Sequence, residues 1–133
     1  MASGDARELA GLLLEKAAGD VATLKAVLSS EEVPDEAVGL HAQQAVEKAL
    51  KAVLASRGVR YPFTHDIDRL VELTEAEAVV LPQNLREAGA LTPWALAHRY
   101  ESAPSLGAER EDMLRMASAA VTWARGLVQF TDE

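Results

Sequence analysis

The sequence has no cysteine, and this absence excludes both a disulfide framework and a thiolate metal site. A chain without cysteine is compatible with a reducing compartment, and we expect a cytoplasmic protein. The sequence also has no apolar run long enough to span a membrane, and its first residues lack the basic and apolar blocks of a signal peptide. We therefore expect no contact with a membrane.

Aromatic residues are scarce as well, at 5% of the 133 residues, whereas hydrophobic residues make up 49%. Aliphatic side chains must therefore fill the core. The alternating β-branched residues that indicate strands are missing, and so are internal repeats and long linkers. These absences predict one all-α domain that spans residues 1–133.

The sequence has fewer basic residues than acidic ones, 13 compared with 21, which gives a formal net charge of −8. Proteins that hold nucleic acid by bulk electrostatic attraction are usually basic, so this chain would repel a phosphate backbone at long range. Contact with nucleic acid would need a local basic cluster or a small site for one nucleotide. The acidic balance also fits an interaction domain that never touches nucleic acid.

The motifs of several enzyme classes are absent too. There is no glycine-rich phosphate loop and no motif of an acyl-transfer nucleophile. The three histidines, His41, His65 and His98, do not have the spacing of metal ligands. We therefore predict neither a metal ion nor another cofactor.

What the sequence does contain is helical periodicity. Asp5 opens a capping-box spacing, and the apolar stripe that follows predicts one long helix, with its members at Leu9, Leu13, Ala17, Val21, Leu24 and Leu28. A second helix is expected to begin at Pro34 or Asp35 and to end at Gly58.

Later helices are expected over residues 64–80, 82–89 and 108–130, with a further short one from Thr92. The third helix should begin at Thr64 or His65. Together these segments predict an all-α, up-and-down bundle of four long helices plus one or two short helices.

The middle of the chain resembles a known family. The segment "HAQQAVEKALKAVLASRGVRYPFTHDIDRLVEL", residues 41–73, is similar to the signature of the HEPN domain family (higher eukaryotes and prokaryotes nucleotide-binding). The family pattern has an "HAQQAxEKALKAL"-like helix face, a turn with glycine, and "THDL" opening the next helix. Arg99-Tyr100 resembles an "RYP"-like element before the last helix, with Glu101 in place of proline.

The resemblance implies a helical bundle that commonly dimerises. Many members are thought to be metal-independent ribonucleases with an Arg-(x4–6)-His motif, and others to be non-catalytic RNA- or nucleotide-binding modules. Small prokaryotic members are often paired with a minimal nucleotidyltransferase in toxin–antitoxin-like systems. Two departures count against toxin activity and against nucleotidylation. Tyr61 follows the arginine where active members often carry a small polar residue, and Ile67 stands where toxin members can carry tyrosine.

Arg60 and His65 are the candidate catalytic residues. Cleavage of RNA needs a base for the 2′-hydroxyl proton and positive charge where the phosphorane oxygens gain negative charge. Histidine titrates near neutral pH, and arginine donates two parallel hydrogen bonds to phosphate. A turn that contains Pro62 could fold both side chains toward one cleft.

A simpler interpretation of this pair remains open. Nine arginines and three histidines produce such a spacing easily by chance. Arg60 and the first turn of the following helix could also hold a phosphate with no catalysis at all.

Six further residues are candidates for substrate binding. Gln44, Lys48 and Lys51 recur at helical spacing and could face the same cleft, but we favour a solvated face with a Glu47–Lys51 ion pair. Asp66 is included because it adjoins the histidine and would stabilise positive charge there.

Arg99 and Tyr100 complete the set. They could bind phosphate and stack on a base, or they could simply cap a short helix.

Three functions follow from these features. The first is a homodimer whose two Arg60/His65 pairs meet near the subunit interface and bind or cleave RNA, as a metal-independent ribonuclease of toxin–antitoxin type. The second is a non-catalytic module that binds a nucleotide or a partner such as a minimal nucleotidyltransferase. The third is a helical interaction or scaffold protein.

Overall fold

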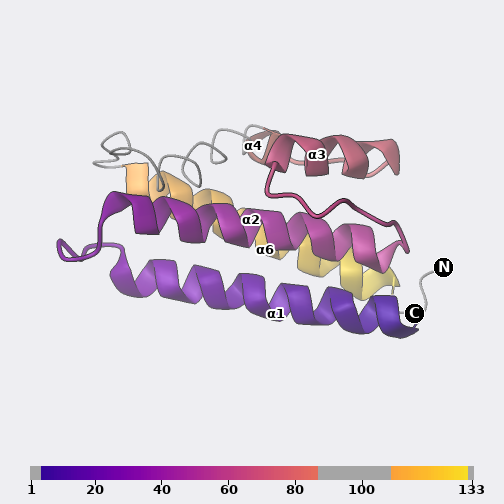
Figure 1. The fold of residues 1–133 in the computed structure, drawn as a ribbon, viewed down its shortest axis with the longest axis horizontal. Helices are drawn as coiled ribbons and strands as arrows, with labels where there is room; N and C mark the ends of the chain where they lie inside the picture. The colour runs from indigo at the N-terminus through magenta and orange to yellow at the C-terminus, as the bar shows by residue number, and fades with distance from the viewer. Residues whose placement is uncertain (1–3, 87–108, 132–133) are drawn as a thin grey trace.

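Five helices make up the part of the chain that the computed structural model describes, residues 4–86 and 109–131 (Figure 1). They are α1 (Gly4–Val27), α2 (Asp35–Ser56), α3 (Ile67–Ala76), α4 (Gln83–Arg86) and α6 (Glu109–Thr131). The same residues contain no strand, so the predicted all-α bundle is confirmed. None of these helices is apolar enough over a sufficient length to cross a membrane. The short helix predicted from Thr92 lies outside the described residues.

Helix α2 lies at the centre of the bundle. It packs against α1, α6 and α3, and Figure 1 shows α1 and α3 on opposite sides of it. A helix that is covered on three sides buries residues around most of its circumference, and α2 does so. Many of the fully buried residues in the three long helices are small, which lets the helices approach closely: Ala10, Ala17, Ala42, Ala45, Ala49, Ala52, Ala117, Ala120 and Ala124.

The core is aliphatic, as the scarcity of aromatic residues predicts. Among the described residues, the buried hydrophobic side chains include no phenylalanine, tyrosine or tryptophan. The largest fully buried ones are Leu24, Leu50, Leu54, Ile67, Leu70 and Leu85. Packing specificity therefore comes from the fit of leucine and isoleucine between alanine-lined helices.

Helix α1 is one continuous helix, as predicted, but its buried stripe is only partly the predicted one. In its first half Ala10 and Leu14 are buried, whereas Leu9 is 42% exposed and Leu13 is half-buried. The prediction assumed one narrow stripe. Because α1 packs on both α2 and α6, its buried face is wider and includes side chains beside that stripe.

The turn after α2 is where the prediction from sequence was most accurate. Gly58 has φ 71°, its N–H donates to the carbonyl of Ala55 at 2.9 Å, and Val59 N–H donates to the carbonyl of Leu54 at 3.0 Å. This pair of bonds is the Schellman motif, which favours glycine at the left-handed position. The turn therefore fixes the direction in which the chain leaves α2.

Helix α3 begins later than predicted, at Ile67 and not at Thr64 or His65. Asp66 is the N-cap: its backbone is extended, and its side chain accepts a hydrogen bond from the backbone N–H of Arg69 at 3.4 Å. The hydroxyl of Thr64 in turn accepts the backbone N–H of Asp66 at 3.0 Å. These local bonds compete with helix formation, so His65 lies in the connection and not in the first helical turn.

Helix α3 also ends earlier than the predicted Val80. It stops at Ala76, and Ala78 adopts φ 61°, in the left-handed region. Its N–H donates to the carbonyl of Glu75 at 3.0 Å, as in a helix terminus that normally carries glycine. The predicted short helix after Pro82 is present as α4, and its predicted end at Gly89 lies outside the described residues.

Arg110 joins the start of α6 to the connection between α1 and α2. Its Nε donates to the carboxylate of Asp35 at 2.8 Å. Its other nitrogens donate to main-chain carbonyls at distances from 2.8 to 3.3 Å, those of Val27, Leu28, Ser30 and Val33. The guanidinium thus satisfies orphan carbonyls at the end of α1 and in the connection.

Replacing Arg110 with alanine should lower the free energy of unfolding by about 3 kcal/mol, because one carboxylate and four carbonyls lose a charged donor. Arg115 on the same helix is the control: it is 68% exposed, and within the described residues it pairs only with exposed Asp112. Arg115→Ala should change the free energy by about 0.5 kcal/mol at most. Denaturant titration of both variants measures the difference, and equal effects would contradict the anchoring role.

Replacing Ala78 with glycine should raise the free energy of unfolding by about 1 kcal/mol, because glycine has no steric penalty in the left-handed region. The matched control is Ala22→Gly, at an exposed position inside α1, which should lower it by about 1 kcal/mol. Thermal unfolding of both proteins tests this pair of opposite signs. A loss of stability in Ala78→Gly would show that the backbone there is not strained.

Candidate functional site

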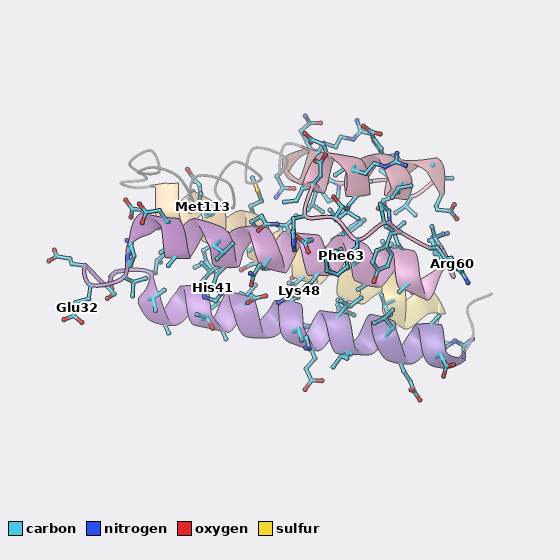
Figure 2. The ribbon with its side chains drawn as sticks, viewed as in Figure 1. Glu32, His41, Lys48, Arg60, Phe63 and Met113 are labelled. Atoms are coloured by element: carbon cyan, nitrogen blue, oxygen red, sulfur yellow. The ribbon has the colours of Figure 1, made fainter. Side chains whose placement is uncertain are left out.

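The connection between α2 and α3, residues 57–66, carries the candidate catalytic residues. Figure 1 shows this segment running back along α2, between that helix and α3. Figure 2 shows Arg60 near the end of α2 and Phe63 nearer its middle. The connection is therefore extended along α2 and is not a compact turn.

A buried carboxylate holds the connection to α2. The side chain of Glu47 is 7% exposed and accepts hydrogen bonds from three donors. Gln43 Nε2 lies 2.6 Å from Oε1, Lys51 Nζ lies 2.9 Å from Oε2, and His65 Nδ1 lies 2.9 Å from Oε1. A buried charge is stable only when it is paired and hydrogen-bonded, and these donors meet that need.

The ring of His65 contacts Glu47 through Nδ1, and the rest of the ring is largely exposed to solvent. Its ring is 64% exposed although Nδ1 contacts Glu47. Because a carboxylate only accepts, the proton is on Nδ1, so that in the neutral ring Nε2 has the lone pair. Gln43 Nε2 also donates to the main-chain carbonyl of His65 at 3.4 Å. This geometry presents a fixed, accessible proton acceptor.

Lys51 lies on the same face of α2. Its side chain is only 12% exposed, and its ammonium group lies 5.7 Å from the centre of the Tyr61 ring. Burial raises the pKa of the Tyr61 phenol, so at neutral pH the hydroxyl stays protonated and does not act as a base. The predicted Glu47–Lys51 pair exists, but it is buried where a solvated face was expected.

Arg60 is exposed and borders a different feature, a groove of about 510 Å³ at the end of the bundle. The groove is lined by Ala6, Leu9, Ala55, Gly58, Val59, Arg60 and Tyr61. His65 is not among the described residues that line it. Ala55 and Glu47 are eight residues apart on α2, which corresponds to about 12 Å along the helix. Within one chain, Arg60 and His65 therefore lie at different levels of α2.

The predicted row of Gln44, Lys48 and Lys51 does not face a single cleft. Lys48 turns to α1, where its ammonium group lies 2.7 Å from Oδ2 of Asp20 (Figure 2). His41 Nδ1 lies 3.2 Å from the other oxygen of that carboxylate. Lys51 points to the connection instead. Residues three apart on a helix differ by about 60° in direction, and this difference separates the side that faces α1 from the side that faces the connection.

The remaining candidates have simpler placements. Gln44 is half-buried and makes no side-chain hydrogen bond to another described residue. Asp66 serves as the N-cap of α3. Arg99 and Tyr100 lie outside the described residues. No three His, Cys, Asp or Glu side chains gather closely enough in the described part to hold a metal ion.

Two residues of the site were missed from the sequence. Gln43 was not singled out and Glu47 was assigned to a solvated face, yet these residues are 1% and 5% exposed. A signal was available: together with Lys51 they recur every four residues on a helix that is apolar around most of its circumference. Polar residues on such a helix have to be buried too, and buried polar residues need partners.

Replacing Glu47 with alanine should lower the free energy of unfolding by about 3 kcal/mol, because it leaves the buried Lys51 ammonium without its carboxylate. Glu72→Ala is the control, since Glu72 is 68% exposed and pairs with exposed Arg69 at 3.5 Å. It should lose about 0.5 kcal/mol at most. Replacing both Glu47 and Lys51 with leucine should restore much of the stability, since no charge is then buried alone. Equal losses in Glu47→Ala and Glu72→Ala would refute the buried cluster.

The family resemblance noted in the sequence was tested by comparison with known proteins. A model of the HEPN domain matches residues 10–130, which is nearly the whole chain. No match was found among curated proteins or among solved structures. Membership in this family implies binding of nucleotides or RNA, often with ribonuclease activity. The match over this length shows that the chain belongs to the HEPN domain family.

Proposed function

We propose that the protein binds RNA and cleaves it as a metal-independent endoribonuclease, with His65 as the general base and Arg60 as a phosphate-binding residue. The observation that carries this proposal is the contact of His65 with buried Glu47, at 2.9 Å. A carboxylate that orients one ring nitrogen leaves the other ready to accept a proton. Family membership supports RNA as the substrate.

The reaction needs only groups of the protein and of RNA together with water, which protonates the leaving oxygen and takes back the proton from His65. Nε2 of His65 takes the proton of a 2′-hydroxyl, and the 2′-oxygen forms a bond to the adjacent phosphorus. The bond from phosphorus to the 5′-oxygen breaks, and that oxygen leaves with a proton from water. The products are a 2′,3′-cyclic phosphate and a 5′-hydroxyl. An arginine near the phosphorus would stabilise the negative charge of the intermediate phosphorane.

The proposal includes a homodimer. Arg60 and His65 lie at different levels of α2 within one chain, so a second copy with its own pair would add positive charge close to the reacting phosphate. The chain has a net charge of −8 and needs such a local concentration of cations. We further propose that this ribonuclease acts in the cytoplasm as part of a toxin–antitoxin system, with a minimal nucleotidyltransferase as its partner.

A second candidate function is a non-catalytic module that binds a nucleotide or that nucleotidyltransferase. The separation of Arg60 from His65 within one chain favours it, and so does Tyr61 at a position where active members often carry a small polar residue. Position 67, where toxin members can carry a tyrosine, is an isoleucine here, and it is fully buried at the start of α3. This position therefore offers no exposed hydroxyl group for nucleotidylation.

Single-stranded RNA incubated with the pure protein and a metal chelator should be cut. His65→Ala should lower the rate at least about a hundred-fold, because a general base contributes that much or more. Arg60→Ala should also abolish cutting. His41→Ala and Arg69→Ala are matched controls, since His41 contacts Asp20 and Arg69 pairs with Glu72, and both variants should cut normally.

Three other outcomes would decide against the first proposal. Undiminished cutting by a folded His65→Ala protein would remove His65 as the base. Binding of RNA or nucleotide without cutting would favour the non-catalytic module. If neither ligand binds, the protein is a helical interaction or scaffold protein, and its mass in solution then becomes the informative quantity.

A further inference from the structure

Phe63 is the most exposed large hydrophobic side chain in the described part of the chain, at 99%. Burial of a phenylalanine side chain contributes about 1.5–3 kcal/mol, and the folded chain does not obtain this stabilisation at Phe63. Aromatic residues make up only 5% of the sequence. An exposed aromatic ring in such a chain is a candidate for contact with a ligand.

The position of Phe63 ties it to the candidate base. The rings of Phe63 and His65 meet edge to face, with centroids 6.2 Å apart and an angle of 68° between their planes. His65 is itself 64% exposed and is held by Glu47 at 2.9 Å. The exposed aromatic ring and the exposed imidazole therefore belong to one surface.

The connection presents this ring in a defined direction. Pro62, directly before Phe63, has a fixed φ because of its ring. After Phe63, the Thr64 hydroxyl accepts the N–H of Asp66 at 3.0 Å, and the carbonyl of His65 accepts from Gln43 at 3.4 Å. A backbone segment that is already restrained loses little freedom when a ligand binds to a side chain on it, which favours affinity.

The surroundings of Phe63 fit a nucleobase better than a protein partner. Among the other large apolar side chains that are exposed in the described part, Leu12 lies on α1 and Val80 lies after α3. Leu9 lines the groove beside Arg60 and is not in the ring contact that Phe63 makes with His65. A protein interface usually needs a continuous apolar patch, whereas a base needs one ring with cations nearby. Arg57 and Arg60 are exposed on the same connection, and their guanidinium groups bond to no other described residue.

We propose that Phe63 stacks on a base of single-stranded RNA and thereby positions the adjoining phosphodiester at His65, while Arg60 binds a phosphate farther along the strand. This inference rests on the proposed function, because it assigns a substrate contact to the same site. Phe63 is a positioning residue and takes no part in proton transfer. Stacking does not depend on base identity, so the contact selects unpaired strands more than particular sequences.

Two fluorescent probes test the proposal by anisotropy. One is a 2′-O-methylated oligoadenylate of about ten nucleotides, within the usual range of single-strand sites, which cannot be cleaved because its 2′-oxygen is blocked. The other is an abasic strand with the same number of phosphates. The wild type should bind the first on the order of ten-fold more tightly than the second. Phe63→Trp should keep this preference, whereas Phe63→Leu and Phe63→Ala should lose it.

Val80→Ala is the matched control, because Val80 is 82% exposed and lies outside the connection; it should bind both probes like the wild type. A preference for bases that survives in Phe63→Ala overturns the proposal. So does a Phe63→Leu protein that behaves like the wild type, because the contact is then apolar and not stacking. Conversion of a dimer to a monomer by Phe63→Ala would reassign the ring to an interface between copies.

The outcome for the wild type separates this inference from the proposed function. If the wild type binds and cuts RNA while the base preference is insensitive to residue 63, only the stacking role falls. If the wild type binds neither probe, the RNA-binding function falls and the stacking role falls with it.

Discussion

The carboxylate of Glu47 is the interaction on which the rest of the site depends. It is buried in α2 and joins three donors, one on the following segment of chain and two on its own helix. Removing this one group would leave Lys51 as a buried cation and His65 without the contact that fixes its ring. Stability and the chemistry of the candidate site therefore depend on the same carboxylate.

The position of α2 explains why such a carboxylate exists. A helix surrounded by α1, α6 and α3 has no solvated face on which to place its polar residues. It pairs them internally on two sides: Glu47 on the side of the connection, and Lys48 with Asp20 on the side of α1. Arg110 holds the opposite end of the bundle, where α1 passes into α2. These polar contacts fix the orientation of helices whose alanine-lined contacts are otherwise uniform.

The helices could be predicted from the sequence because their signals are local. Apolar periodicity and the glycine at 58 place α1 and α2 to within a residue or two. The start of α3 was misplaced because the Asp66 cap was overlooked. The site was harder, since the burial of Glu47 depends on how a later segment packs on α2. Arg110 was not predicted because its partners lie 75 to 83 positions away in the sequence.

The proposed chemistry depends most directly on which nitrogen of the His65 ring carries the proton. If Glu47 orients His65, the neutral ring carries its proton on Nδ1, and Nε2 is free to act as the base. Long-range proton–nitrogen NMR correlation spectra of the intact protein at about pH 8, where histidine is normally neutral, report the tautomer of each ring. We expect the Nδ1–H form for His65. The Nε2–H form at this residue would exclude His65 as a base oriented by Glu47, because the nitrogen needed as the base would then carry the proton.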